Sequence, residues 1–314
     1  MTEPAKPPAR YAELQVTSHF SFLRGASSCE ELFVQAAHLG IEALAVTDRN
    51  SLAGIIRAYE AARASDIRLI VGCRLDFTEG ISLLVYPTDR PAYAQLCRLL
   101  SLGKKRGGKA RCRLSWADVV EYGEGLLAVY LPDQADESCT SSLSRLQQDF
   151  GDRAYMALTL RHRPNDQLRL HDLANLATRH GVRSVVTNDV LFHVRERRIL
   201  QDVVTCIRHG CTIDDAGFRR ERYADRYLKP PEEMHRLFRH HPEALARTME
   251  IMGRCQFSLD ELSYQYPDEA LTPGLTAQQT LAKLTWEGAK ERYPDGVPRQ
   301  VIAILAHELR IKTH

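Results

Sequence analysis

The amino-acid sequence predicts an α/β fold, a closed or nearly closed barrel of βα units followed by a helical segment. Strand-like and helix-like segments alternate up to residue 189, and strands separated by helices of about 10 to 15 residues are typical of parallel βαβ units. At least six of these strands end in loops that carry polar residues, and the sequence has no GxGxxG motif. A barrel, whose loops gather at its carboxyl-terminal face, is therefore favoured over a mononucleotide-binding half.

Each element of the barrel is predicted from the spacing of its apolar residues. Short apolar runs mark the strands, which fall at 12–21, 42–48, 68–77, 80–87, 125–132, 154–162 and 183–189. Apolar residues at helical spacing mark the helices between them, at 28–40, 51–65, 90–105, 115–123, 138–151 and 165–181. Gly40 ends the first of these helices, since glycine is common where a helix stops.

The remainder of the chain is predicted to be helical. Helices are expected at 195–210, 230–255 and 276–293 and from residue 298 onwards, joined by turns that contain proline. Three regions follow: a proline-rich disordered leader at 1–10, a barrel with a helical extension at 11–255, and a linker with helices at 256–314. Because the last helix stops without a capping residue, we expect the sequence to be part of a longer protein.

Composition is typical of a soluble globular protein, with 314 residues, 44% hydrophobic and 26% charged. No apolar stretch approaches the roughly 20 residues that span a bilayer, and the start lacks the apolar core of a signal peptide, so a cytoplasmic protein is expected. The eight cysteines are scattered without a CxxC pair, which indicates reduced thiols and argues against a zinc ribbon.

The net charge is only +2, from 42 basic and 40 acidic residues, but one segment is strongly basic. The segment GKKRGGKARCR contains no acidic residue, and its cations are Lys104, Lys105, Arg106, Lys109, Arg111 and Arg113. Such a run suits a loop that contacts nucleic-acid phosphates, or a solvated loop tip. For a single run of this length we favour the solvated loop tip.

Several sequence blocks carry a family resemblance when they are taken together in order. They begin with ELQVTSHFSFLRGASSCEELFVQAAHLGIEALAVTDRNSLAGIIRAYEAA and continue with LCRLLSLGKKRG, CRLSW, LQDVVTCIRHG and YPDGVPRQVIAILAHEL. From Tyr11 to Leu309 the chain resembles the PHP (polymerase and histidinol phosphatase) domain at the N-terminus of bacterial C-family DNA polymerases, the DNA polymerase III alpha subunit group. Within that family it is most similar to the error-prone, damage-induced branch.

This resemblance implies a distorted (β/α)7-type PHP barrel followed by a helical C-terminal segment. Active PHP domains hold up to three metal ions with His, Asp and Glu on the carboxyl-end loops, and they hydrolyse phosphoesters or proofread 3′ ends. In the polymerases, nucleotide addition belongs to a palm domain further along the chain. The catalytic aspartates of that domain are expected beyond residue 314, so this chain is not expected to polymerise DNA by itself.

The first family metal motifs are mostly replaced in this sequence. The HxH motif at the end of the first strand corresponds to Gln15 and Thr17, and the ligand in the following loop corresponds to Arg24. The TDH-like triplet reads Thr47, Asp48 and Arg49, which keeps the carboxylate and loses the imidazole. Amide, hydroxyl and guanidinium groups are poor substitutes for imidazole as ligands of a divalent metal.

The later motifs show the same replacement. The glutamate after the third strand corresponds to Arg74, and the NDxH motif keeps Asp189 but has Leu191 in place of histidine. Asp76, one strand period from Arg74, is a possible substitute ligand, although a solvated acid at a strand end is the simpler interpretation. His19, His162 and His193 also lie near the expected rim.

We expect no metal and no cofactor. A divalent metal (zinc, manganese or magnesium) would bind only in a rearranged site built from Asp48, Asp189, His19 and His193. The expectation is instead that Arg24, Arg49 and Arg74 neutralise Asp48 and Asp189, with Asp48 paired to an arginine.

The leading functional hypothesis is therefore a non-catalytic scaffold of an error-prone polymerase, in the context of DNA repair and translesion synthesis. Its partners by resemblance are DNA, the rest of the polymerase chain, accessory mutasome proteins and the sliding clamp, with no membrane. The alternatives are a metal-dependent phosphoesterase or 3′–5′ exonuclease with a rearranged site, and a nucleic-acid-binding module that uses the basic run.

Overall fold

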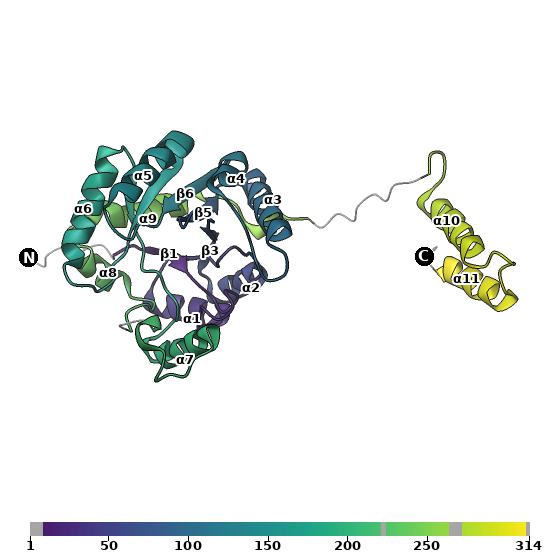
Figure 1. Ribbon diagram of the computed structural model, residues 1–314, viewed down its shortest axis with the longest axis horizontal. Coiled ribbons are helices and arrows are strands. Elements are labelled where there is room, and N and C mark those ends of the chain that lie inside the picture. The colour runs from purple at the N-terminus through teal and green to yellow at the C-terminus, as the bar shows by residue number, and fades with distance from the viewer. Residues whose placement is uncertain (1–8, 221–223, 264–271, 312–314) are drawn as a thin grey trace, which may run out of the picture. The chain divides into compact units, whose positions relative to one another are not determined.

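The structure, a computed structural model, describes residues 9–220, 224–263 and 272–311. The chain divides into two compact units, Met1–Leu262 and Ser263–His314. The described part of the first unit contains a barrel of strands surrounded by helices (Figure 1). The described part of the second unit contains the helices α10 (Ala277–Arg292) and α11 (Arg299–Ile311).

The strands of the first unit form two sheets. β1 (Ala12–Val16), β2 (Ala43–Val46) and β3 (Arg68–Val71) make a parallel three-stranded sheet in that order. The second sheet has the order β4-β5-β6-β7-β8, and its strands are Cys73–Asp76, Ser82–Pro87, Leu126–Tyr130, Ala154–Leu158 and Arg183–Val186. Strands β6, β7 and β8 run parallel to one another.

The two sheets are joined at both edges, which gives a distorted barrel. On one side the amide of Thr17 donates to the carbonyl of Val190 at 2.9 Å, and the amide of Val190 donates to the carbonyl of Gln15 at 2.8 Å. On the other side, Arg49 and Arg74 form an isolated parallel bridge. β3 and β4 are the two halves of one predicted strand, separated by Gly72. The predicted α/β class, a distorted barrel of strands followed by helices, is confirmed.

Gly72 lies between the two halves of this strand, at a position that has no room for a side chain. A Cβ atom at this position would lie 2.8 Å from Cδ1 of Tyr86 and 2.9 Å from Cγ2 of Thr47. The break lets β3 finish the first sheet while β4 starts the second.

One strand runs against the expected direction. β5 is antiparallel to both β4 and β6, whereas the sequence suggested parallel βαβ units throughout. Only residues 77–81 connect β4 to β5, and a parallel crossover needs about a dozen residues or more. The short connection therefore forces a hairpin at this point.

The helices of the first unit begin and end close to the predicted positions, except that the helix expected at 230–255 is divided into two, with Pro242 starting the second. Their bounds are α1 Cys29–Leu39, α2 Ile55–Ser65, α3 Arg90–Gly107, α4 Trp116–Glu121, α5 Glu137–Phe150, α6 Asp166–Arg179, α7 Arg198–His209, α8 Pro231–Leu237 and α9 Pro242–Arg254. Short 3-10 helices occupy Gly151–Arg153, Arg195–Arg197, Gly217–Arg219 and Leu259–Glu261. Ser28 starts α1 with a capping box, and Gly40 ends it with φ +71°, as its sequence predicts.

Apolar residues line both faces of the strands. Along β2, Leu44 and Val46 belong to the larger apolar cluster, which includes residues of α1 and α2. Ala43 and Ala45 belong to a second cluster, which also contains Ile251 of α9. Strands that are covered on both faces have continuous apolar sequences rather than alternating ones. This pattern is the reason why the strands could be predicted from the sequence.

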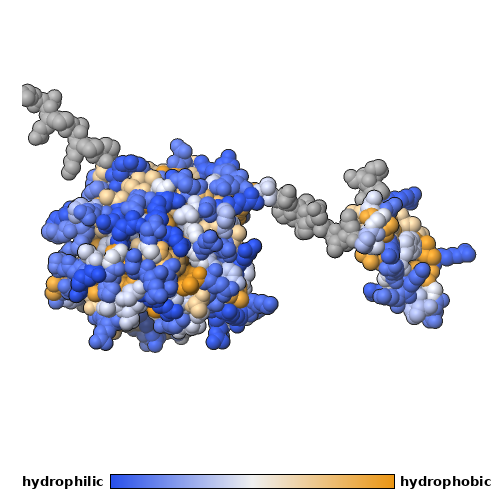
Figure 2. All heavy atoms as spheres, turned by 90° about the horizontal axis from the view of Figure 1, so that it is seen from above, coloured by the Kyte–Doolittle hydropathy of each residue, from blue (hydrophilic) through white to orange (hydrophobic). Residues whose placement is uncertain are grey.

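The face of the first unit that Figure 2 shows is mainly hydrophilic, with small separate apolar areas. Within residues 9–220, 224–263 and 272–311, none of the helices combines the length and the apolarity that crossing a bilayer requires.

Candidate functional site

Three carboxylates mark the barrel rim, which lies where β1, β2, β4 and β8 end. They are Asp48, Asp76 and Asp189, and we call them the rim carboxylates. Asp48 and Asp189 follow β2 and β8 respectively, while Asp76 is the last residue of β4. Each of the three is held by protein donors, and the donors differ from one carboxylate to the next.

Asp48 is held by the loop that follows β1. Its side chain accepts hydrogen bonds from the amide of Ser18 at 2.9 Å, the Ser18 hydroxyl at 2.7 Å and the Ser21 hydroxyl at 2.7 Å. Asp48 is only 2% exposed, and burial raises its pKa, against the hydrogen bonds from Ser21 and Ser18. The expected pairing of Asp48 with an arginine is wrong, because serine donors already occupy its oxygens.

Arg49 and Arg74 bind Asp76 instead. An Nη of Arg49 lies 2.7 Å from Oδ2 of Asp76, and Nε of Arg74 lies 2.8 Å from Oδ1. The Ser82 hydroxyl donates to the same Oδ1 at 2.7 Å. Burial alone would raise the pKa of Asp76, but Arg74 and Arg49 outweigh burial and lower it. Asp76 is thus the structural partner of both arginines and not a solvated strand end.

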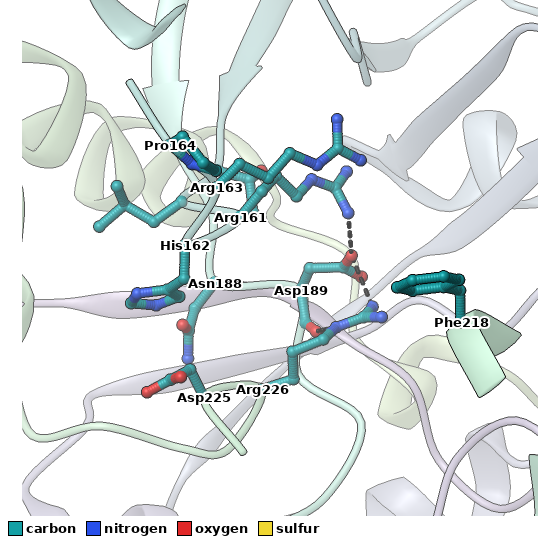
Figure 3. A pocket seen from close by; sticks show the side chains of 11 residues that line it. Arg161, His162, Arg163, Pro164, Asn188, Asp189, Phe218, Asp225 and Arg226 are labelled. Atoms are coloured by element: carbon teal, nitrogen blue, oxygen red, sulfur yellow. Dashed lines mark hydrogen bonds and ion pairs between the residues drawn. The ribbon is translucent and has the colours of Figure 1, made fainter. Parts of the chain in front are cut away.

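Asp189 is enclosed by an amide and two guanidinium groups. Nε2 of Gln15 donates to its Oδ1 at 2.7 Å, while Oδ2 lies 3.2 Å from Arg161 and 2.5 Å from Arg226. Figure 3 shows both arginines pointing at this carboxylate from different segments. Although burial opposes ionisation, Arg226 and Arg161 hold the pKa of Asp189 well below its usual range. An arginine partner was expected here, but from Arg24, Arg49 or Arg74.

The other expected rim positions have structural roles. Thr17 is buried, and its amide bonds to the strand-end segment after β8. Leu191 is 6% exposed and packs with Ala26 and Phe192 in a small apolar cluster. Arg24 is half-buried beside the arginines that bind Asp76.

The histidines near the rim have other partners. Nδ1 of His193 lies 2.8 Å from the Ser27 hydroxyl, and Nδ1 of His19 lies 3.2 Å from the Ser27 carbonyl. His162 has a left-handed backbone with φ +52°, and its amide donates to Asp166 at 2.8 Å. Across the part of the chain that the structure describes, no group of three or more His, Cys, Asp or Glu side chains is arranged to hold a metal ion.

The donor set around the rim carboxylates does not fit a divalent metal. A metal ion needs lone pairs from carboxylate, imidazole or carbonyl groups. Guanidinium and ammonium groups provide only N–H donors, and Oδ2 of Asp189 faces two guanidinium groups. At Asp48 the nearest donors are hydroxyl and amide groups that already point at its oxygens. No reaction step is therefore assigned to a metal in this site.

A cavity of about 500 Å³ opens beside Asp189. Its lining includes Arg161, Arg163 and Arg226, together with Phe218, whose side chain is fully exposed. Figure 3 shows the Phe218 ring next to the guanidinium group of Arg226. The acidic residues Asp189 and Asp225 also line this cavity, so its three arginines exceed the acids by only one, and Leu160 and Pro164 add apolar surface.

The basic run lies only partly in a loop. Lys104, Lys105 and Arg106 belong to the last turn of α3, which continues to Gly107. Arg106 places one Nη atom 2.7 Å from each carboxylate oxygen of Asp118, so this side chain supports the start of α4. The other cations of the run, Lys109, Arg111 and Arg113, follow the helix and are exposed.

Sequence reasoning missed the actual partners of the rim carboxylates. Ser18 and Ser21 fall at the end of the strand predicted at 12–21, beyond the observed end of β1 at Val16, so their hydroxyl groups near the rim were a usable signal. Arg161 is next to last in the strand predicted at 154–162, so its position near the rim could also be inferred. Arg226 lies between predicted helices, where the sequence gives no sign that it approaches the rim.

The chain is similar to known proteins over most of its length. Residues 13–156 match the model of the PHP domain family. The chain is 67% identical over 302 residues to "Error-prone DNA polymerase 1" of Agrobacterium fabrum (strain C58 / ATCC 33970), covering 96% of this chain and 28% of that protein. It is 65% identical over 302 residues to "Error-prone DNA polymerase 2" of Rhizobium meliloti (strain 1021), with the same shares.

These matches confirm the predicted resemblance to the PHP region of error-prone DNA polymerases. The chain spans less than a third of the length of these relatives. A solved structure, described as a putative metal-dependent phosphoesterase from Bifidobacterium adolescentis ATCC 15703, is 16% identical with a TM-score of 0.46. That match covers 59% of this chain and 88% of the other.

Proposed function

We propose that this chain is the PHP region of an error-prone DNA polymerase that acts in DNA repair and translesion synthesis, and that its barrel is a metal-free scaffold. The high identity to polymerases of that description supports the context. Nucleotide addition would be carried out by another part of such a polymerase. The proposed partners are the rest of the polymerase chain and DNA, with accessory mutasome proteins and the sliding clamp inferred from resemblance alone.

The observation that carries the metal-free proposal is the surroundings of Asp189. Gln15, Arg161 and Arg226 come from three separate segments and meet on one carboxylate that is only 3% exposed. A metal ion in a PHP site would join loops by binding ligands from several of them. Here permanent positive charges join the loops instead, and a buried carboxylate needs such partners to remain ionised.

A second feature supports the scaffold role. Helix α7 exposes its apolar side chains, with Ile199 73%, Val203 41% and Ile207 60% exposed, while it buries Gln201 and Thr205. We call Ile199, Val203 and Ile207 the α7 stripe. An exposed apolar stripe that continues along a whole helix is typical of a contact surface. We assign it to the rest of the polymerase chain, because the relatives are more than three times as long as this chain.

Metal analysis of the purified full chain tests the scaffold proposal. Protein prepared without chelators should contain far less than one equivalent of zinc, manganese or magnesium, and EDTA should leave its melting temperature unchanged. Tight stoichiometric metal would overturn the proposal.

A nuclease assay tests the alternative, a phosphoesterase or 3′–5′ exonuclease. With Mn²⁺ and a generic phosphodiester, no hydrolysis above background is expected. Hydrolysis that disappears in Asp48→Ala and Asp189→Ala, but persists in the exposed control Asp133→Ala, would establish the enzyme and exclude the scaffold interpretation.

A further inference from the structure

A second cavity, of about 430 Å³, lies beside the Asp76 cluster. It is formed by the loop after β1, the loop after β2 and the segment that follows α3. Four of its lining side chains are cations, Arg24, Arg49, Lys104 and Arg111, and Asp76 is the one acidic side chain in the lining. We call this cavity the basic cleft.

Asp76 cannot neutralise this many cations. Its Oδ1 accepts from Arg74 and Ser82, and its Oδ2 accepts from Arg49, so both oxygens are engaged. Arg24 lies next to this cluster, and within the described residues its guanidinium makes no hydrogen bond and no ion pair. The basic cleft therefore holds positive charge that the described side chains do not balance.

The lowered pKa values of Arg49 and Arg24 are consistent with this excess of positive charge. Burial lowers the pKa of Arg49 to about 10, and Arg74 and Arg24 contribute to the shift by repulsion. Burial also lowers the pKa of Arg24, with further repulsion from Arg208 and Arg74. An anion placed between these groups would reverse both effects, since it favours the charged form of each arginine.

The exposure of the cationic side chains increases from the interior of the basic cleft to its mouth. The side chain of Arg49 is 26% exposed and Arg24 is half-buried, whereas Lys104 and Arg111 are exposed at the mouth. Phe22 also lines the cleft, and its ring is 83% exposed. Proteins that bind single strands combine a cationic groove for the backbone with aromatic rings on which bases stack.

We propose that the basic cleft binds a phosphate group of single-stranded DNA through Arg24, Arg49, Lys104 and Arg111, with an adjacent base stacked on Phe22. The choice of DNA rests on the proposed function, whereas the phosphate chemistry follows from the cleft itself. Arg24 and Arg49 hold the phosphate in the interior, and Lys104 and Arg111 lead the strand to it. The other four cations of the basic run do not line the cleft: Lys105, Arg106, Lys109 and Arg113.

That distinction provides a matched pair of variants. Binding of a fluorescein-labelled oligo(dT) to the full chain is measured by anisotropy over a range of salt concentrations. The double variant Lys104→Gln/Arg111→Gln should bind about tenfold more weakly at low salt, and its log–log salt slope should fall by about 1.4 for two lost single-strand contacts. The control Lys105→Gln/Arg113→Gln removes the same charge from exposed positions and should stay within about twofold of the parent.

Equal losses in the two double variants would show unspecific attraction to a basic surface and would overturn the proposal, as would unchanged binding in both. All four positions are exposed, so these variants should fold. Circular dichroism confirms the fold of each variant.

A second arm distinguishes a DNA strand from a free phosphate compound. Phe22→Ala should weaken oligo(dT) binding by about fivefold or more, as expected for one lost stacking contact. Pyrophosphate, used as a competitor, should displace oligo(dT) only at concentrations far above the Kd of the strand. If Phe22→Ala has no effect and pyrophosphate competes at that Kd, the cleft is a site for small phosphate compounds and the DNA assignment is wrong. Metal content is measured separately, so failure of the scaffold proposal would not be confused with failure here.

Discussion

The side-chain amide of Gln15 donates to Oδ1 of Asp189 across 2.7 Å, although the two residues are 174 positions apart in sequence. This hydrogen bond connects β1 to the segment after β8, at the edge where the two sheets of the barrel meet. Both residues stand at positions of the metal motifs that the family resemblance implies, and here their side chains contact each other directly.

Loss of the Asp189 charge should destabilise the barrel. Asp189→Asn keeps the shape of the side chain and tolerates the left-handed backbone, φ +52°, but leaves Arg161 and Arg226 without their carboxylate. We expect the free energy of unfolding in urea to fall by about 3 kcal/mol, the low end for breaking a buried ion pair. The control Asp133→Asn breaks an exposed pair with Arg163 and should cost less than about 1 kcal/mol. Equal costs would contradict the structural role of Asp189.

Glu13 should make stability fall as the pH rises. It is fully buried on β1, and burial raises its pKa to about 7. Hydrogen bonds from the backbone amide of Gln15 and the hydroxyl of Tyr11 oppose this rise. A carboxyl whose pKa is raised on folding stabilises the fold fully below its unfolded pKa, and this stabilisation disappears as the pH approaches about 7. The parent should therefore lose stability between about pH 5 and about pH 8, whereas Glu13→Gln has no such carboxyl to ionise. The free energy of unfolding of Glu13→Gln, relative to that of the parent, should rise over this range by on the order of 3 kcal/mol.

Urea unfolding of both proteins at several pH values measures this difference. Glutamine can keep its carbonyl for the Gln15 amide and offer its NH2 to the Tyr11 oxygen, so the fold should be retained. Glu42→Gln, at a partly exposed position beside the same sheet, is the control and should not show a difference that increases with pH. A flat difference for Glu13→Gln would mean that Glu13 is already ionised in the folded protein.

Polar substitution of the α7 stripe should reduce self-association without loss of stability. The double variant Ile199→Ser/Ile207→Ser removes little buried apolar surface, since both side chains are more than half exposed. The free energy of unfolding should change by less than about 0.5 kcal/mol per site, while light scattering at high concentration should decrease. Leu173→Ser, at a fully buried position on α6, should instead destabilise by several kcal/mol. Strong destabilisation by the stripe variant would show that α7 packs through this face.

The fold could be predicted largely from the sequence because its strands are apolar on both faces. Runs such as the one at Ala43–Val46 stand out between polar turns and leave little choice of element. The direction of β5 could not be read in the same way, since apolar spacing is identical for either direction. Only the short connection at 77–81 distinguishes the hairpin from a crossover.

The candidate site was predictable in position but not in its contacts. Asp48 and Asp189 could be placed at the rim because carboxyl ends of parallel strands meet there. Their partners come from elsewhere: Arg161 lies 28 positions and Arg226 37 positions from Asp189. Which cation reaches a carboxylate depends on packing between loops, and one sequence contains no information on that packing. Arg49 shows the limit, since it follows Asp48 directly yet binds Asp76.

The hairpin between β4 and β5 has a practical consequence for engineering. Its connection carries no helix, and Thr78, Glu79 and Gly80 are exposed, with open space around Gly80. Most other strands of the barrel lead into a helix that covers the outside, so lengthening those connections risks displacing the helical layer. Inserted residues, such as a reporter tag, should be tolerated best at Gly80, because Thr78 and Glu79 bond to Leu114 and Trp116 at the start of α4.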